Sequence, residues 1–179
     1  MKIFFGGSRR VSQLSPAIIQ RANNIMNNGY TVLIGDANGA DKSMQSYLAQ
    51  HDYKNVIVYC MGNQCRNNIG KWQTRNILSD RIKKDFQYFA TKDYEMSQEA
   101  EFGFMLWDGK SKGTLNNMLN LLNQKKQVLV YFSPEKLFYT IRNNDNLITL
   151  LGRCEKTSRK SFETSLNLSN RISEFSFAS

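Results

Sequence analysis

The chain has 179 residues and a formal net charge of +9, which suits one compact domain with a short appendage. Hydrophobic residues make up 41% of the sequence and charged residues 22%, so disordered and low-complexity classes are excluded. No apolar run approaches the roughly 20 residues that span a bilayer, and the apolar stretch at 3–5 is too short for a signal-peptide core. We therefore expect a soluble, cytoplasmic protein without a membrane partner.

Apolar runs alternate with amphipathic stretches over the first 132 residues, which is typical of parallel strands connected by helices. The expected strands span 2–5, 30–34, 56–59, 102–107 and 128–132, and the expected helices span 16–28, 40–49, 92–101 and 113–124. Residues 60–85 are polar and basic, so we expect an exposed loop and then an irregular or helical segment, followed by a short strand at 87–91. The alternation predicts an α/β fold with a mainly parallel sheet and helices on both faces.

Beyond Pro134 the pattern is less regular. We expect an edge strand at 137–141, a short helix at 145–151 and one serine-rich helix at 159–175. The chain is therefore divided into a core domain, 1–133, and a C-terminal extension, 134–179, which packs on the domain or on a partner subunit.

Cysteine and histidine content limits the possible chemistry. The three cysteines, Cys60, Cys65 and Cys154, are odd in number and lack a Cys-x-x-Cys spacing, so we expect reduced thiols rather than a disulfide framework or a zinc knuckle. His51 is the single histidine, which excludes a multi-histidine metal site. We expect no metal and no required cofactor.

Three glycine-containing loops follow predicted core strands, at the sheet edge where parallel sheets bind ligands. The first contains Gly6, Gly7, Ser8, Arg9 and Arg10. Its glycines let a phosphate or sugar approach the backbone, and its hydroxyl and guanidinium groups can bind it. The alternative is a plain tight turn.

The second loop contains Gly35, Asp36, Asn38, Gly39 and Asp41. It lacks the spacing of a P-loop, and the chain has no Gly-x-Gly-x-x-Gly fingerprint. The third loop joins a strand to a helix, and its candidate residues are Asp108, Gly109, Ser111, Gly113 and Thr114. Asp108 could bind ribose hydroxyls and the others phosphate, although a well-capped turn would have the same composition.

Basic residues are concentrated at 66–92, where seven outnumber two acidic ones: Arg66, Lys71, Arg75, Arg81, Lys83, Lys84 and Lys92 against Asp80 and Asp85. Such a region is either a solvated helix face or a functional basic patch.

Taken in order, these motifs resemble the SLOG superfamily, which includes the DNA-processing Smf/DprA proteins and the Lonely Guy phosphoribohydrolases. The resemblance covers residues 1–132 and is closest to the YspA-related branch. It rests on Gly-Ser-Arg, Gly-Asp-Ala-Asn-Gly-Ala-Asp, Arg75-Asn76, Lys92-Asp93-x-x-Met96 and Trp-Asp-Gly-Lys-Ser-Lys-Gly-Thr. It implies a Rossmann-like three-layer sandwich, a homo-oligomer, and a nucleotide-type ligand at the strand ends, with Arg75 and Asn76 in the site. Phe162, Phe175 and Phe177 of the extension also need burial, which favours the oligomer.

Two departures weaken a hydrolase assignment. Lonely Guy enzymes have a glutamate where this chain has Asn117, and a paired Arg-Lys where it has Lys92-Asp93. An amide cannot act as a carboxylate acid or base. Asp93, Glu95 and Glu99 could serve instead, although a charged helix face is the commoner explanation of such residues.

We therefore expect binding or sensing of a nucleotide or a nucleotide-derived ligand, such as an NAD derivative or a nucleoside phosphate. The first alternative is an N-glycosidic bond hydrolase or transferase, meaning a nucleoside or nucleotide N-glycosidase or a phosphoribohydrolase. The second alternative is DprA-like nucleic-acid binding. Only the basic region supports that partner, and we do not favour it.

Overall fold

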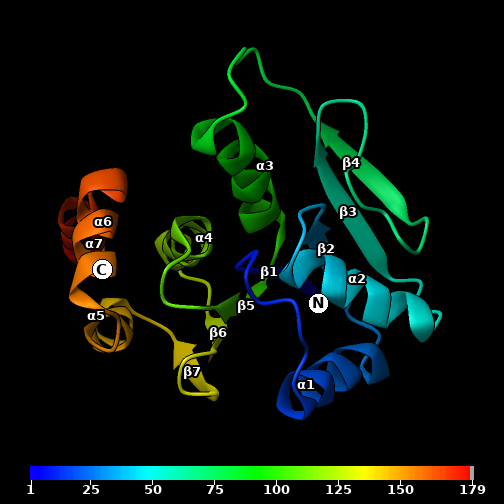
Figure 1. Cartoon of the computed structure of the whole chain (residues 1–179), viewed down its shortest axis with the longest axis horizontal. Coiled ribbons are helices and arrows are strands. Elements are labelled where there is room, and N and C mark those ends of the chain that lie inside the picture. Colours follow the sequence, from blue (N-terminus) through cyan, green and yellow to red (C-terminus); the bar gives the residue numbers. More distant parts are fainter. Residues whose placement is uncertain (178–179) are drawn as a thin grey trace.

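The computed structural model describes the backbone of residues 1–177 and the side chains through Ser173. Within this part of the chain, seven strands form one sheet in the order β4-β3-β2-β1-β5-β6-β7 (Figure 1). All neighbouring strands are parallel except β6 and β7. The strands are β1 Lys2–Gly7, β2 Thr31–Gly35, β3 Val56–Met61, β4 Gln73–Ile77, β5 Phe102–Trp107, β6 Val128–Phe132 and β7 Leu137–Ile141.

Side-chain caps define where several helices begin. Ser15 accepts a hydrogen bond from the Ile18 N–H, and Pro16 occupies the first helical position of α1, where its missing N–H costs nothing. Ser111 caps α4 in the same way. The helices are α1 Pro16–Asn27, α2 Ala40–Gln50, α3 Phe86–Glu99, α4 Lys112–Asn123, α5 Asn144–Gly152, α6 Lys156–Leu166 and α7 Leu168–Phe177.

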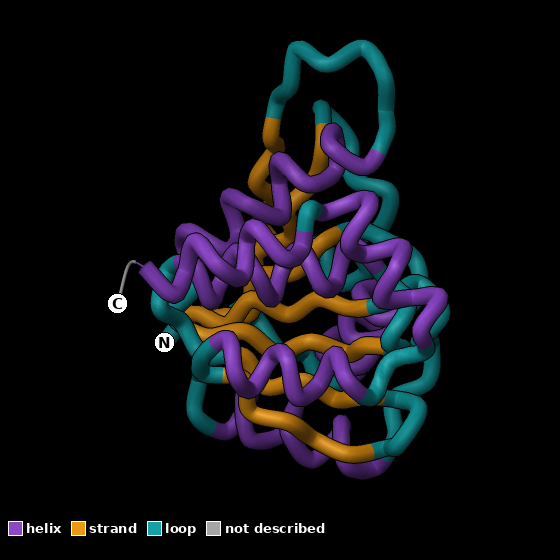
Figure 2. Tube along the Cα trace, turned by 90° about the vertical axis from the view of Figure 1, so that its left-hand side faces the viewer, coloured by secondary structure: helices purple, strands orange, loops and turns teal. Residues whose placement is uncertain are grey.

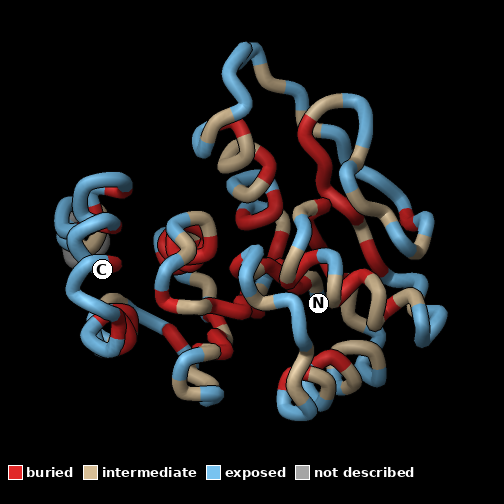
Figure 3. Tube along the Cα trace, viewed as in Figure 1, coloured by how far each residue is buried: buried red, intermediate tan, exposed pale blue. Residues whose placement is uncertain are grey.

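The central strands are buried on both faces, so consecutive residues serve two cores. Phe5 belongs to the core beneath α1 and α2, together with Ile18 and Leu48. Phe4 belongs to the opposite core beneath α3 and α4, together with Leu119. Figure 3 shows the buried residues following the strands and the helix faces turned toward them. The three-layer α/β fold predicted from the sequence is confirmed.

The segment at 60–85 contains a strand that sequence patterning missed. Strand β4 pairs in parallel with β3, with Arg75 opposite Tyr59. Its sequence is polar and mostly exposed because it lies at the sheet edge, so no apolar period marks it. The expected strand at 87–91 is wrong, because Asp85 accepts a hydrogen bond from the Tyr88 N–H and starts α3 at Phe86.

The C-terminal extension packs on its own domain. The single helix expected at 159–175 is two helices, since Asn167 adopts a left-handed conformation with φ 50° between α6 and α7. Phe162 is fully buried, with its ring centroid 5.9 Å from that of Trp107. Phe162 therefore gives no argument for a second subunit. The side chains of Phe175 and Phe177 lie outside the described residues.

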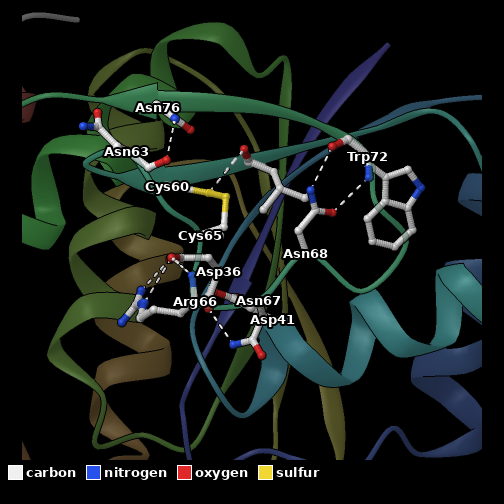
Figure 4. Close-up of a disulfide and its surroundings, with 12 residues drawn as sticks. Asp36, Asp41, Cys60, Asn63, Cys65, Arg66, Asn67, Asn68, Trp72 and Asn76 are labelled. Atoms are coloured by element: carbon white, nitrogen blue, oxygen red, sulfur yellow. Dashed lines mark hydrogen bonds and ion pairs between the residues drawn. A yellow bond between two sulfur atoms is a disulfide. The ribbon is translucent and has the colours of Figure 1, made fainter.

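A disulfide joins Cys60 and Cys65 (Figure 4), so the expectation of reduced thiols is wrong for this pair. Cys60 lies near the end of β3, beside the edge strand β4. Gly62, with φ +73°, turns the chain back on itself. This turn brings the two Cα atoms to 5.0 Å, which a disulfide can bridge. Cys154 is a free, buried thiol.

Among the residues described, no helix combines the length and apolarity needed to cross a membrane.

Candidate functional site

A cleft of about 520 Å³ opens at the carboxyl ends of β1 and β5. These strands are neighbours, and the chain proceeds from β1 toward β4 on one side and from β5 toward β7 on the other. The cleft thus lies at the point where the strand order reverses, which is where open α/β sheets bind ligands. Figure 2 shows the loops gathered at this end of the sheet, along one side of the molecule.

Ten of the predicted ligand residues line the cleft, and they come from all three loops: Gly6, Gly7, Ser8, Arg9, Gly35, Asp41, Asp108, Ser111, Gly113 and Thr114.

The other six predicted residues lie outside it: Asp36, Asn38, Gly39, Arg75, Asn76 and Gly109. Arg75 and Asn76 stand on the edge strand β4, where Arg75 pairs with Glu99 and Asn76 donates to the Asn63 carbonyl. Gly39 instead packs against the Arg9 backbone.

Asp108 connects the loops after β1 and β5. Its Oδ2 accepts a hydrogen bond from the Ser8 hydroxyl at 2.8 Å. Its Oδ1 accepts from the backbone N–H groups of Lys110, at 3.0 Å, and Ser111, at 2.8 Å. The carboxylate therefore holds the two cleft-lining loops together, and a role toward ribose stays a prediction.

The first turn of α4 faces the cleft and has room beside it. A Cβ built on Gly113 would have the Ser111 hydroxyl, at 4.0 Å, as its nearest neighbour. One turn further on, the buried Asn117 side chain lines the cleft. Its Oδ1 has no hydrogen-bond partner among the described residues. Unpaired backbone N–H groups, the helix dipole and a buried acceptor thus meet in one place.

A buried charged cluster forms one wall of the cleft. Lys92 is 4% exposed, and its Nζ donates to Asp93 Oδ1 at 2.6 Å. Gly35 lets the Asp41 and Lys92 side chains approach the backbone, since a Cβ there would lie 2.6 Å from Asp41 Oδ2 and 3.0 Å from Lys92 Nζ. Burial raises the pKa of Asp41 to about 7. Burial alone would lower the pKa of Lys92, but Asp93 and Asp41 outweigh it and raise that pKa.

Arg66 lines the cleft, whereas the sequence marked it only as one residue of the basic region. It directly follows Cys65 of the disulfide. Its backbone N–H, at 3.0 Å, its Nε, at 3.1 Å, and its Nη2, at 2.5 Å, donate hydrogen bonds to the Asp36 carboxylate (Figure 4). Burial opposes ionisation of Asp36, yet these bonds to Arg66 leave its pKa lowered. The guanidinium also lies 4.7 Å from the centroid of the Phe89 ring.

Phe86 and Phe89, on the first turn of α3, form an aromatic wall of the cleft. Phe86 is 36% exposed. The sequence offered no signal that the wall and the glycine loops would meet. Seven basic residues line the cleft against four acidic ones: Arg9, Arg10, Arg66, Lys84, Lys92, Lys110 and Lys112 against Asp41, Asp85, Asp93 and Asp108.

The three candidate catalytic carboxylates are separated along α3. Asp93 lines the cleft but pairs with Lys92. Glu95 is exposed outside the cleft. Glu99, near the far end of the helix, accepts from Lys2 Nζ at 2.7 Å and from the Tyr59 hydroxyl. Across the described chain, no group of three or more His, Cys, Asp or Glu residues is placed to hold a metal ion.

No family model matches the sequence, and no curated protein matches it. The structure is similar to that of DNA processing protein A from Helicobacter pylori, whose description concerns its single-stranded DNA binding mode. The TM-score is 0.55 at 16% identity, over 93% of this chain and 80% of that chain. The similarity supports a DprA-like Rossmann fold. The finer resemblance to the YspA-related branch stays a prediction.

Proposed function

We propose that this protein binds a nucleotide-type ligand in the cleft between β1 and β5. The observation that carries the proposal is the buried Asn117 Oδ1, without a partner among the described residues, beside the first turn of α4. A buried acceptor without a donor is costly, and a ligand hydroxyl or amine would satisfy it.

The surroundings of Asn117 support a location for each part of such a ligand. Phosphate fits the open first turn of α4 at Gly113, where unpaired N–H groups and the helix dipole favour an anion and where Arg9 lines the cleft. The base fits the aromatic wall of Phe86 and Phe89, since stacking on aromatic rings suits every base. Asn117 lines the same cleft and would bind the sugar.

A charge placed at Gly113 tests the phosphate position. Gly113→Asp adds an acidic group at the second position of α4, which favours the helix but repels a phosphate. Ala17→Asp adds the same charge at the second position of α1, where Ala17 is exposed and outside the cleft. Calorimetry measures the affinity of both variants for the common nucleoside monophosphates, for NAD and for the matching nucleosides.

We expect Gly113→Asp to weaken nucleotide binding by about tenfold or more, the equivalent of one charge-assisted hydrogen bond. Nucleoside binding should change little, and Ala17→Asp should behave as the unmodified protein. If no nucleotide binds, or if the two variants bind equally well, the cleft is not a phosphate site. Mass spectrometry of the same mixtures shows whether a bound nucleotide loses its base, which is the N-glycosidase alternative.

The second candidate function is binding of single-stranded nucleic acid, which two observations favour. One is the fold similarity to a single-stranded DNA binding protein. The other is the loop at 78–85, which projects from the molecule between β4 and α3 (Figures 1 and 2) and carries Arg81, Lys83 and Lys84. Replacing Lys83 and Lys84 with glutamate should abolish binding of an oligonucleotide in a gel shift. Unmodified protein should also lose affinity steeply with salt.

A further inference from the structure

The C-terminal extension contacts the cleft through two lysines next to the proposed phosphate position. Both Lys110 and Lys112 line the cleft. Lys110 Nζ lies 2.8 Å from Oε1 of Glu155, the residue immediately before α6. Lys112 Nζ donates to the Ser165 hydroxyl, in the last turn of α6, at 3.1 Å. Helix α6, which packs beside α4 (Figure 1), therefore holds two of the ammonium groups of the cleft.

The ion pair between Lys110 and Glu155 is exposed, unlike those of the other paired cations of the cleft. Within the described part of the chain, the three ion pairs of cleft cations are Lys92 with Asp93, Arg66 with Asp36, and Lys110 with Glu155. The acidic side chain is 2% exposed in Asp36 and 18% in Asp93, but 62% in Glu155. Exposed ion pairs contribute little, because water and salt screen them. Lys110 is thus the paired cation that changes partner most easily.

A phosphate at the first turn of α4 offers Lys110 a stronger partner than Glu155 does. It carries up to two negative charges and would lie inside the cleft, where protein atoms replace much of the water that screens charges. The flexible lysine stem lets the ammonium group change partner without backbone movement. Lys110 lines the cleft and Glu155 does not, so the two partners draw the ammonium group in different directions.

We propose that Lys110 binds a phosphate of the ligand and that Glu155 competes with this phosphate for the same ammonium group. The contact with the extension is then autoinhibitory, because it lowers the affinity of the cleft for phosphorylated ligands and not for nucleosides. This inference rests on the proposed function, since a phosphate must occupy the cleft. It adds Lys110 to the ligand residues and gives the extension a part in ligand binding.

Glu155→Gln tests the competition without removing a contact on which the fold depends. The side chain is exposed and makes no capping hydrogen bond to α6. Glu135→Gln is the matched control, because Glu135 is a second acidic residue of the extension that accepts from an arginine, Arg153 Nη1, at 3.0 Å, outside the cleft. Calorimetry measures the affinity of both variants and of the unmodified protein for the common nucleoside monophosphates and for the matching nucleosides.

We expect Glu155→Gln to bind the monophosphates about threefold more tightly, which is the effect of removing one exposed ion pair. Nucleoside affinity should not change, because a nucleoside has no phosphate to compete for Lys110. Glu135→Gln should change neither affinity.

Lys110→Gln separates competition from a general change of charge. A charge-assisted hydrogen bond to phosphate contributes about tenfold, and Glu155 offsets about threefold of it. Lys110→Gln should therefore weaken monophosphate binding by about threefold. Adding Glu155→Gln to Lys110→Gln should give no further change, because the ammonium group for which both partners compete is gone. A direct repulsion between Glu155 and the phosphate would instead give the same gain with or without Lys110.

The outcomes distinguish this inference from the proposed function. If the monophosphates bind but Glu155→Gln gives no gain, or gives a gain that persists in Lys110→Gln, the competition is wrong while the proposed function stands. An equal gain for nucleosides, or an equal gain in Glu135→Gln, contradicts the competition in the same way. If the monophosphates bind neither the unmodified protein nor any variant, both proposals are wrong.

Discussion

At the scale of single residues, the cleft combines groups that hold the fold with groups that lack a partner within it. Asp108 accepts three hydrogen bonds from its own chain, while the buried Asn117 Oδ1 accepts none from the described residues. Asp108 lies in the loop after β5, and Asn117 lies in the second turn of α4, the helix that follows. Their different roles follow from which donors the folded chain brings near them.

Replacing Asp108 with alanine should lower the free energy of unfolding by about 2 kcal/mol, because hydrogen bonds to a charged acceptor are lost and the loops after β1 and β5 separate. Ligand affinity should fall as well. Asp108→Asn retains an acceptor for the Lys110 and Ser111 N–H groups, so most of the stability should return. Urea unfolding of both variants and of the unmodified protein measures these stabilities. If Asp108→Ala is as stable as the unmodified protein, the three hydrogen bonds contribute little.

The raised pKa of Asp41 predicts how the stability of the protein changes with pH. Its pKa in the folded protein is raised from 3.8 to about 7 by burial, so between these values the folded state binds the proton that the unfolded state releases. Stability should therefore decrease as pH rises from about 4 to 7 through this group and level off above. In Asp41→Asn this decrease is absent, so the variant should gain stability relative to the unmodified protein between pH 5 and pH 8. Urea titrations at both pH values test it.

At the scale of elements, the loops after β1 and β2 pack together through a glycine. Gly39 has φ +82°, and a Cβ there would overlap the Arg9 carbonyl group. The close approach positions the β1 loop beside the start of α2, where the Ala40 N–H donates to the Ser8 carbonyl at 3.3 Å.

Gly39→Ala should therefore destabilise the protein more than Gly29→Ala. Gly29 has φ +66° but no atom within 4 Å of a Cβ position, so its substitution costs about 1 kcal/mol from backbone conformation alone. Gly39→Ala adds a backbone collision to that cost. Thermal unfolding should show a clearly larger drop in Tm for Gly39→Ala. Similar drops for both variants would mean that the loop shifts freely.

At the scale of the whole molecule, the extension shares the core of the domain. Phe162, Leu166 and Leu168 belong to the same buried cluster as β5, β6 and α4. Domain and extension should thus unfold together. A homo-oligomer stays a prediction, which light scattering would test.

Phe162→Ala should lower the free energy of unfolding by about 3 kcal/mol, because it opens a cavity against Trp107. Ile148→Ala is the control, since Ile148 is an apolar residue of the extension that is 51% exposed. Fluorescence and circular dichroism should show one shared transition at lower urea for Phe162→Ala. Two separate transitions would show that the extension is an independent unit.

The sequence by itself determined the α/β class and most of the parallel sheet. Strands at 102–107 and 128–132 match the structure residue for residue, because buried strands read as continuous apolar runs. The edge strand at 137–141 also matches, although it is only partly buried. Three cleft-lining loops were found in the same way, since a loop that follows a parallel strand must emerge at its carboxyl end.

Only the tertiary structure decided which further residues join the cleft and how the edges are built. Arg66 reaches Asp36 across 30 residues of sequence, and Ser8 reaches Asp108 across 100. The polar edge strand β4 and the aromatic wall of α3 likewise depend on partners distant in the chain. The Cys60–Cys65 disulfide spans only five residues, and it depends on the turn at Gly62. Local periodicity reports which side of an element is buried, but it carries no information about which other element lies against it.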